Sequence, residues 1–519
     1  MVQRVNLDAM IQREDFARET AGQPTPRIIT ELKLSDLLPN SGIRRQLRKP
    51  EFQRETNHWT PEQVVRLVKS FIDGDVIPSI ILWRSTNFVF VIDGAHRLSA
   101  LCAWLEGDYG DRATSKAFYN DEISEIQKRV AARVRKEIEK EHCNYSILDG
   151  MVGKPGDSLA ALRAGAMNTR PIVVQTVEGN AKVAEESFFA INSQGTPLDD
   201  TEKYLIRNRN KAVSIGARAI ARSGTGHVYW SSFGKNEQDK IVSLSKELHT
   251  FLFEPEVSTP LKTLDLPLAG SKSPVEALSV LIDFLTVVSP KPDFVKLADS
   301  SIMPDDKSGD NTIQALERGL QVVRRITTNR PESLGLHAAV YFSNDKGKHN
   351  KFLFLGCSAL IAEKLRNNDG DWFKKFTRAR ANLERFLIDN KSAIGNILHN
   401  LAKKARIPKM TQMIRFLVDE FTSGRKPEAN EVFLHIGLSG KIYDLGAEKK
   451  SKDFDDNTKS QIFYRDAIKN AQKCPVCSGY LDVAKSVSYD HITPVREGGL
   501  GEVKNGQLVH PYCNSSMKG

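Results

Sequence analysis

The sequence predicts a multidomain α+β protein, in which polar residues 1–29 precede an N-terminal α/β domain, a central mainly helical domain and a small C-terminal module. Three observations favour this class. Strand-length apolar runs alternate with helical segments over residues 30–210, and amphipathic helical spacing dominates residues 211–446. Cysteine and histidine then gather in residues 462–519. At roughly 100–200 residues per domain, a chain of 519 residues has room for all of these parts.

Composition supports folded domains and excludes several other classes of protein. Hydrophobic residues make up 40% of the chain and charged residues 27%, which is typical of globular rather than fibrous or disordered proteins. No apolar stretch approaches the roughly 20 residues that cross a bilayer, and the first residues lack the apolar region of a secretory signal. We therefore expect a soluble, cytoplasmic protein without a membrane partner.

The charge balance gives only weak information about binding partners, and three of the cysteines have an ordinary structural interpretation. The 74 lysines and arginines against 64 acidic residues give a net charge of +10, which favours a polyanionic partner but also fits a solvated basic surface. Six cysteines are too few for a disulfide scaffold in a chain of this length. The isolated Cys102, Cys143 and Cys357 are expected to be buried small apolar residues.

The α/β domain begins with clear local signals. Thr60, followed by a proline, is typical of a helix start, and apolar residues at helical spacing predict a helix over residues 61–71. Residues 80–83 and 88–92 are apolar runs on either side of a short polar turn, which predicts the two strands of a hairpin. A helix over residues 95–105 is expected directly after the second strand.

The patterns further along the chain are coarser. Residues 121–142 predict a charged helix with little apolar stripe, residues 171–177 a strand and residues 182–191 another helix. The clearest amphipathic helices of the central domain are expected at 381–388, 394–401 and 410–421. Residues 447–461 are almost entirely charged or polar, which is typical of a solvated linker.

Four potential zinc ligands mark the C-terminal module. Cys474 and Cys477 are three residues apart, and His510 and Cys513 repeat that spacing. Two such pairs provide the four ligands of a tetrahedral structural zinc site. A module of about 60 residues needs a staple of this kind, since zinc contributes roughly 10–16 kcal/mol to the folding of small domains.

Short motifs follow one another around these ligands. In order they are C-x-x-C at 474–477, D-H-I-x-P at 490–494, G-G at 498–499, N-x-x-L at 505–508 and C-N-x-x-K at 513–518. A strand directs successive side chains to opposite faces, so Asp490 and His491 can serve one site only where the chain turns. Taken alone, the two residues also fit an ordinary turn pair. The whole series, over residues 463–519, resembles the HNH, or ββα-metal, nuclease family. His510 stands where many members of that family have a cysteine.

This resemblance implies a catalytic site residue by residue. His491 is the expected general base that takes a proton from the attacking water, and Asp490 and Asn514 are expected to hold one Mg²⁺ or Mn²⁺ ion on the scissile phosphate. Asn505 is expected to orient the loop and the base, and Lys518 to face a DNA phosphate. The residue types suit these roles, because imidazole accepts protons near neutral pH and hard divalent ions prefer carboxylate and amide oxygens.

A second candidate site lies where the predicted hairpin meets the helix after it. Asp93 and Gly94 form a tight turn there, so the first amides of the helix, with Arg97 one turn further on, make an anion site. The same residues are also compatible with a capped hairpin end and an ordinary surface ion pair.

Motifs around this turn carry a second resemblance. In order they are F-Q-R at 52–54, Trp59, P-E-Q at 61–63, I-P at 77–78, I-D-G-A-H-R-L at 92–98 and N-x-x-G-T-x-L at 192–198. Over about residues 30–210 they resemble the ParB/sulfiredoxin-like domain of GmrSD- and SspE-type defence enzymes. The resemblance implies that nucleotide or phosphate is bound by Gln53, Arg54, Asp93, Gly94, His96, Arg97 and Asn192. The usual motif is Asp-Gly-Gln-Gln-Arg, and Ala95 and His96 replace its glutamines here, which bears on nucleotide hydrolysis more than on binding.

Together these features predict a metal-dependent DNA endonuclease or nickase of a prokaryotic anti-phage or modification-dependent restriction system. Its N-terminal domain would sense nucleotide or modified DNA and control an HNH cutter, with structural zinc, catalytic Mg²⁺ or Mn²⁺ and a nucleoside triphosphate as implied cofactors. Phage or modified DNA is the expected substrate, and other defence-system subunits are implied partners. The alternative is a non-catalytic ParB-like DNA-binding regulator whose zinc module only grips DNA.

Overall fold

The computed structural model describes residues 4–16, 29–51, 53, 56–57, 59–154, 156, 158–194, 199–270, 277–290, 305–437 and 453–517. The chain divides into two compact units. The first is Met1–Arg209 with Thr225–Tyr229, and the second is Asn210–Gly224 with Trp230–Gly519. The part expected to be a helical domain and the part expected to be a separate C-terminal module therefore belong to one compact unit.

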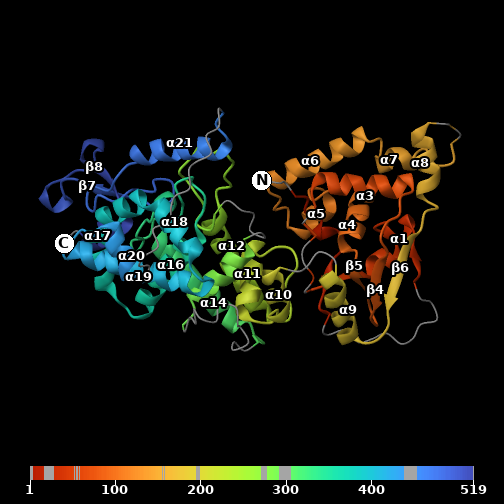
Figure 1. The fold of residues 1–519 in the computed structure, drawn as a ribbon, viewed down its shortest axis with the longest axis horizontal. Helices are drawn as coiled ribbons and strands as arrows, with labels where there is room; N and C mark the ends of the chain where they lie inside the picture. Colours follow the sequence, from red (N-terminus) through yellow and green to blue (C-terminus); the bar gives the residue numbers. More distant parts are fainter. Residues whose placement is uncertain are drawn as a thin grey trace. The chain divides into compact units, whose positions relative to one another are not determined.

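A six-stranded mixed sheet forms the centre of the first unit (Figure 1). Its strands run in the order β1-β3-β5-β4-β6-β2. Their bounds are Arg13–Glu14 (β1), Glu31–Leu32 (β2), Leu47–Pro50 (β3), Ile80–Arg84 (β4), Val89–Asp93 (β5) and Ile172–Val177 (β6). β4 and β5 form the predicted antiparallel hairpin, and β3 and β6 flank it in parallel. The neighbours of the hairpin therefore come from distant parts of the chain.

Helices cover both faces of this sheet. Their bounds are Asp8–Met10 (η1, a 3₁₀ turn), Leu34–Leu37 (α1), Gly42–Gln46 (α2), Pro61–Asp73 (α3), Ala95–Glu106 (α4), Ala113–Phe118 (α5), Glu125–Lys140 (α6), Tyr145–Asp149 (α7), Leu159–Met167 (α8), Ala181–Gln194 (α9) and Asp200–Arg207 (α10). The side chains of β5 alternate between two hydrophobic cores, as the two-residue period of a strand requires. Val91 enters the larger core with α3, α4 and α6, and Phe90 enters the smaller core with α9 and α10.

Most element predictions are confirmed in this unit. The Thr60 hydroxyl caps α3 by accepting from the Gln63 N–H at 3.4 Å, and the Gln63 side chain accepts from the Thr60 N–H at 2.9 Å. The predicted hairpin, the helix after it and the strand over 171–177 are present as β4–β5, α4 and β6. The prediction of little apolar stripe on α6 is wrong, because Val130 and Val134, one turn apart, are both buried.

The described part of the N-terminal segment, residues 4–16, belongs to the core of this unit. Val5 is fully buried, and β1 extends the sheet. Asp8 is also buried, and Nζ of Lys49 donates to its carboxylate at 2.9 Å and to the Thr56 hydroxyl at 2.8 Å. The polar sequence did not indicate this role, because two partners of the buried carboxylate, Lys49 and Thr56, lie 41 and 48 residues away. Arg13 pairs with the same carboxylate from within the segment.

Helices build most of the second unit. Their bounds are Ala212–Ala221 (α11), Lys235–Phe253 (α12), Leu278–Val287 (α13), Asp310–Ile326 (α14), Ala338–Tyr341 (α15), Lys351–Arg366 (α16), Gly370–Asp389 (α17), Lys391–Asn400 (α18), Lys403–Thr422 (α19), Ala429–His435 (α20) and Asp456–Lys469 (α21). The helices predicted at 381–388 and 410–421 are parts of α17 and α19, and the one at 394–401 corresponds to α18. Among the described residues, no helix is both long enough and apolar enough to cross a membrane.

The stretch expected to be a linker ends earlier than residue 461. Residues 447–452 lie outside the described part of the chain, but α21 begins at Asp456, and the Asp455 carboxylate caps it by accepting from the Thr458 N–H at 2.7 Å. Further along α21, Tyr464 is buried and donates its hydroxyl to the carbonyl of Ala339. Charged residues on the outer side of α21 gave this segment its linker-like composition.

After α21 the chain forms a second, two-stranded sheet. β7 (Ser488–His491) and β8 (Gly506–Val509) pair in antiparallel fashion, and short helical turns lie between and after them. These turns are Val495–Glu497 (η4), Val503–Asn505 (η5) and the π-helical turn Cys513–Met517 (η6). Two strands followed by a short helical turn thus complete the described chain.

Candidate functional site

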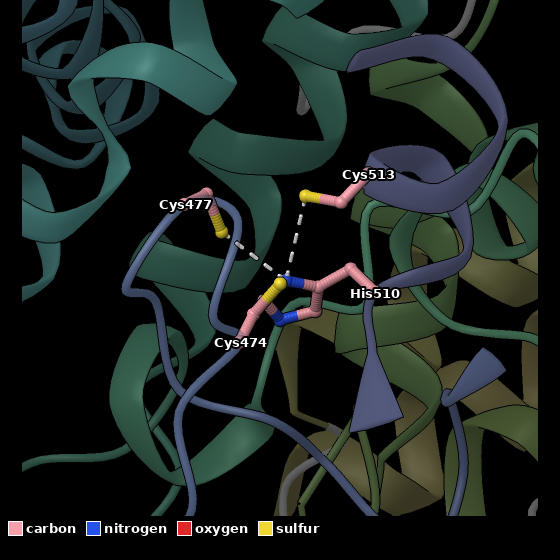
Figure 2. Close-up of side chains that lie close together, drawn as sticks. All are labelled: Cys474, Cys477, His510 and Cys513. Atoms are coloured by element: carbon pink, nitrogen blue, oxygen red, sulfur yellow. Dashed lines mark hydrogen bonds between the residues drawn. The ribbon is translucent and has the colours of Figure 1, made fainter. Parts of the chain in front are cut away.

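The four residues expected to bind zinc meet in the second unit (Figure 2). One ligand atom from each of Cys474, Cys477, His510 and Cys513 lies within 4.8 Å of the others. Nδ1 of His510 is 3.3 Å from Sγ of Cys477 and 3.9 Å from Sγ of Cys513. Three sulfur atoms and one imidazole nitrogen form a donor set that can hold a metal ion such as zinc.

Two changes of chain direction bring these ligands together. After Cys474 the backbone folds back, so that the Ser478 N–H donates to the Cys474 carbonyl and the Cys474 N–H donates to the Gly479 carbonyl, both at 2.8 Å. His510 directly follows β8, and Cys513 begins η6, so the second pair occupies a strand-to-helix junction. The cluster is therefore built from one tight turn and one junction that are more than 30 residues apart.

The surroundings favour the metal-binding protonation state at His510 and Cys474, whereas hydrogen bonding to Cys474 raises the pKa of Cys477 and of Cys513. Burial lowers the pKa of the His510 imidazole, and the positive charge of Arg380 lowers it further. Hydrogen bonds from the thiols of Cys477 and Cys513 lower the pKa of Cys474. Neutral imidazole and thiolate are the forms that bind zinc.

Two of the predicted catalytic residues lie side by side in β7. Asp490 pairs with Gln507 across the sheet, and His491 pairs with Gly506. Nε2 of Gln507 donates to Oδ2 of Asp490 at 2.7 Å, which fixes that carboxylate. β7 continues through His491, so the turn expected between Asp490 and His491 is absent and the bend comes only after the histidine. Strand geometry therefore directs the two side chains to opposite faces of β7.

The Asn505 side chain ties together the loop between the strands. Its Oδ1 accepts from the Thr493 N–H at 2.7 Å, and its Nδ2 donates to the carbonyls of Thr493 at 3.1 Å and Leu500 at 2.9 Å. A β-carbon at Gly499 would lie 1.8 Å from the Thr493 oxygen and 2.9 Å from Asn505 Nδ2, so this turn of the loop admits only glycine. These contacts fix the shape of the chain that follows β7.

Asn514 reaches from η6 to the beginning of β7. Its Nδ2 donates to the Ser488 hydroxyl at 2.8 Å and contacts the Tyr489 carbonyl at 3.4 Å. Ser488 and Asp490 are two residues apart in a strand and share a face, so Asn514 lies on the side of β7 that carries Asp490. The structure thus brings the two residues expected to hold the catalytic ion to one face. Lys518 lies outside the described residues.

In the first unit, the turn after β5 is tightly built. Nη2 of Arg97 donates to Oδ2 of Asp93 at 2.7 Å and to the Ser79 carbonyl at 3.1 Å. Gly94 has a φ of +93°, and a β-carbon there would lie 2.4 Å from Cδ1 of Ile80, so the position requires glycine. No described side chain caps the start of α4. The ion pair fits the structural interpretation of this turn, and the uncapped amides fit the anion-binding one.

Two further residues of the predicted nucleotide site lie next to this turn. Nε2 of Gln53 donates to the carbonyl of Ile92 at 3.3 Å, one residue before Asp93. The His96 ring stacks on Trp59, with 5.6 Å between the ring centroids. The remaining expected members lie outside the described part of the structure: Arg54 and the side chain of Asn192.

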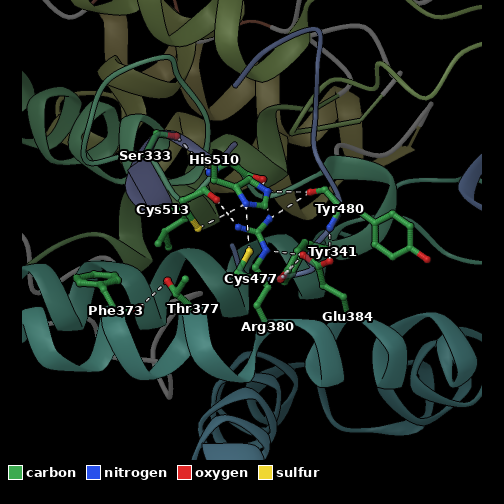
Figure 3. A network of polar contacts seen from close by, with 12 residues as sticks. Ser333, Tyr341, Phe373, Thr377, Arg380, Glu384, Cys477, Tyr480, His510 and Cys513 are labelled. Carbon is green, nitrogen blue, oxygen red and sulfur yellow. Dashed lines mark hydrogen bonds and ion pairs between the residues drawn. The ribbon is translucent and has the colours of Figure 1, made fainter. Parts of the chain in front are cut away.

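Three residues close to the C-terminal site were not predicted from the sequence. Gln507 lies in β8 beside Asp490, whereas Arg380 and Glu384 belong to α17 and reach the metal cluster from the helical part of the unit (Figure 3). Their one sequence signal is an arginine and a glutamate at i and i+4, a spacing that usually marks a surface ion pair. Nothing in that spacing relates them to cysteines about 100 residues further on.

Comparison with known families gives a match to most of the first unit. Residues 34–210 match the family model described as the N-terminal domain of the GmrSD restriction endonuclease. Neither the curated proteins nor the solved structures gave a match to this chain. The matched segment contains β3 to β6 and the turn at Asp93 to Arg97, and it ends before the metal cluster. The first unit is therefore similar to the N-terminal domain of the GmrSD restriction endonuclease, which points to a restriction-endonuclease type of system.

Proposed function

We propose that this chain is a metal-dependent DNA endonuclease or nickase of a prokaryotic restriction or anti-phage system, with an HNH-type cutter in residues 462–519. One observation carries the proposal: a GmrSD-type N-terminal domain shares its chain with a four-ligand metal cluster and with a strand, β7, that carries Asp490 on the side of Asn514 and ends at His491, where the chain bends. The family match supports endonuclease function with DNA as substrate. The donor sets support the metal chemistry.

Two metal sites have separate roles in this proposal. The structural zinc is held by Cys474, Cys477, His510 and Cys513, a set in which protein atoms fill all four positions. Asp490 and Asn514 offer carboxylate and amide oxygens, which suit Mg²⁺ or Mn²⁺. When bound, such an ion stabilises the negative charge that develops on the phosphate and on the leaving oxygen.

His491 is the proposed general base. Its imidazole takes a proton from the water whose oxygen attacks the phosphorus atom, and a positioned base of this kind contributes about 10²–10⁴-fold to a rate. Across the strand pair, the partner of His491 is Gly506, which has no side chain. The loop held by Asn505 begins directly after His491 and limits its movement. Lys518 is proposed to contact a DNA phosphate.

The first unit is proposed to control the cutter. The uncapped start of α4 and the guanidinium of Arg97 are suited to bind a phosphate-bearing ligand, either a nucleoside triphosphate or modified DNA. A bound phosphate would compete with Asp93 for Arg97, which gives the site two states. Gln53, Arg54, His96 and Asn192 are the proposed further contacts, and the replacement of two family glutamines by Ala95 and His96 favours binding over hydrolysis.

Cleavage of plasmid DNA by the purified full-length protein, with Mg²⁺, with Mn²⁺ and with neither, tests this function. His491→Ala and Asp490→Asn should lower the cleavage rate by about 10²–10⁴-fold and leave zinc content and DNA binding unchanged. Glu497→Gln is a matched control, because it changes an exposed carboxylate in the loop after β7 and should cut at the wild-type rate. DNA binding by the wild-type protein without cleavage in either ion would favour the non-catalytic DNA-binding regulator.

A further inference from the structure

The ion pair between Arg380 and Glu384 lies inside the second unit rather than on its surface. Nε of Arg380 is 2.6 Å from Oε1 of Glu384, and each side chain is only 1% exposed. The Tyr341 hydroxyl donates to the same carboxylate oxygen at 2.9 Å. Breaking a buried pair of this kind leaves an uncompensated charge, so both members are needed together.

This pair holds both backbone polar groups of Tyr480, three residues after the second cysteine ligand (Figure 3). The other carboxylate oxygen of Glu384 accepts from the Tyr480 N–H at 2.7 Å, and Nη2 of Arg380 contacts the Tyr480 carbonyl at 3.4 Å. That carbonyl lies 2.9 Å from Nε2 of His510. With its Nε2–H donated to the carbonyl, the imidazole presents Nδ1 to the cysteines, which is the orientation that a metal requires.

The side chains of Arg380 and His510 pack closely against two glycines near the metal cluster. A β-carbon at Gly479 would lie 2.5 Å from Nε of Arg380, and a β-carbon at Gly335 would lie 2.8 Å from Cδ2 of His510. Nη2 of Arg380 donates to the Gly335 carbonyl at 2.8 Å. Glycine at both positions lets the loop after α14 and the loop after the first cysteine pair meet around one guanidinium.

Hydrogen bonds from the loop after α14 extend this contact. The Tyr512 N–H, next to the last cysteine ligand, donates to the Ser333 carbonyl at 2.9 Å. The Ser486 hydroxyl, just before β7, donates to the Thr328 carbonyl at 2.6 Å. The sequence predicts a self-contained C-terminal module. These hydrogen bonds instead connect the chain next to its metal ligands to the helical part of the unit.

Charge gives a further reason for an arginine at this place. Zinc bound to three thiolates and one neutral imidazole carries a net charge of −1, and burial of that charge is costly without a positive group nearby. Burial by itself would lower the pKa of Arg380, but the negative charge of Glu384 outweighs it, and the pKa is raised. The guanidinium therefore stays charged beside the cluster.

We propose that Arg380 and Glu384 are positioning residues of the metal centre, through which the helical part of the chain controls how firmly the C-terminal module holds zinc. The pair fixes the Tyr480 backbone, the Tyr480 carbonyl fixes His510, and His510 completes the ligand set. This inference rests on the zinc site of the proposed function but not on DNA cleavage.

The test measures zinc release from the full-length protein to a chromogenic chelator. Arg380→Gln and Glu384→Gln should each release zinc about 10–100-fold faster than the wild type, the size typical of lost support for a metal ligand. Arg378→Gln is the matched control, because Arg378 is an exposed arginine on the same helix and should release zinc at the wild-type rate. Arg380→Lys keeps the charge but not the forked donor, so it should rescue only part of the loss.

Two further variants separate positioning from loss of fold. Gly479→Ala inserts a methyl group against Arg380 without changing any charge and should also speed zinc release. Leu383→Ala weakens the core of α17 next to the pair and should lower the melting temperature with little change in zinc release. Wild-type release rates in both Glu384→Gln and Gly479→Ala would overturn the inference. Wild-type protein that holds no zinc would refute the zinc site itself, whereas zinc-loaded protein that cuts no DNA would refute only the nuclease proposal.

Discussion

Nε2 of Gln507 lies 2.7 Å from a carboxylate oxygen of Asp490, across the β7–β8 pair. The hydrogen bond holds one oxygen of the carboxylate and thereby sets the direction of the other. Ser488, two residues earlier on the same face, holds the Asn514 amide at 2.8 Å. The two residues proposed to bind the catalytic ion are thus each fixed by a neighbouring polar side chain.

Replacement of Gln507 by alanine is expected to weaken the catalytic ion site without destroying it. Loss of a supporting hydrogen bond typically costs 10–100-fold in metal affinity, so the Mg²⁺ concentration for half-maximal cleavage should rise by at least about 10-fold. At saturating Mg²⁺ the rate should recover most of its wild-type value. Gln472→Ala, which truncates an exposed glutamine in the same module, should leave the Mg²⁺ titration unchanged. An unaltered titration in Gln507→Ala would remove Gln507 from the site.

Cys477→Ala is expected to release zinc and to unfold the module around it. The remaining three ligands leave the buried His510 and Cys474 without their common partner, and little apolar core supports this region. Metal analysis should find less than one zinc per chain, and the melting profile should shift to lower temperature. Cys357→Ala is the matched control, because Cys357 is a buried cysteine of the same unit outside the cluster and its variant should keep zinc. Full zinc content in Cys477→Ala would contradict the ligand set.

Acidification is expected to destabilise the second unit through His337. Burial lowers the pKa of this histidine from 6.5 to about 4, and its ring accepts from the Ala339 N–H at 3.2 Å. The unfolded chain therefore binds the proton first, so the stability that His337 contributes is complete above about pH 6.5 and is lost as the pH falls towards 4. The total change is about 3 kcal/mol.

His337→Asn provides the measurement, because asparagine also caps α15 but does not titrate in this range. Urea unfolding of both proteins between pH 4 and 7 should show a smaller loss of stability in the variant. The zinc ligands respond to acid equally in both proteins, so the difference between the two curves isolates His337. Parallel curves would mean that His337 does not carry the pH dependence.

Asp93→Ala and Arg97→Ala are expected to remove control by a phosphate-bearing ligand. If the turn after β5 is coupled to the cutter, nucleoside triphosphate should change the wild-type cleavage rate by about 5–150-fold, and both variants should lose that response. Arg84→Ala, which removes an exposed arginine at the end of β4, is the matched control. Calorimetry of all four full-length proteins should show nucleotide binding only in the wild type and the control. Equal nucleotide binding in both variants would leave the turn as an ordinary structural ion pair.

Local signals in the sequence predicted the elements that local chemistry determines. The capped start of α3, the β4–β5 hairpin and α4 each depend on residues close together in the chain, and each is confirmed. The parallel partners β3 and β6 of the hairpin could not be predicted in the same way, because their pairing depends on the packing of the whole unit. The burial of Asp8 escaped prediction for the same reason, since two of its side-chain partners, Lys49 and Thr56, are 41 and 48 residues away.

In the candidate site, too, features that depend on nearby residues were predicted and features that depend on distant residues were not. The repeated three-residue spacing of the ligands was enough to predict that Cys474 and Cys513 meet in one cluster. The support for the cluster was not predictable, because Arg380 and Tyr480 come together across 100 residues of sequence. Strand geometry also differs from the expectation at His491, which continues β7 instead of beginning a turn. The assignment of His491 as base, the HNH fold and the ParB-like fold stay predictions.

The glycine at position 479 constrains how such proteins can exchange parts during evolution. Because a β-carbon there would lie 2.5 Å from Arg380, an arginine at this point of α17 requires glycine in the first cysteine turn. A recombination event that transferred only the last 60 or so residues to a new partner would separate the turn from this helix. The smallest transferable cassette must therefore start before the loop at Gly335, so that chimaeras inherit this loop and helix α17 together with the cutter.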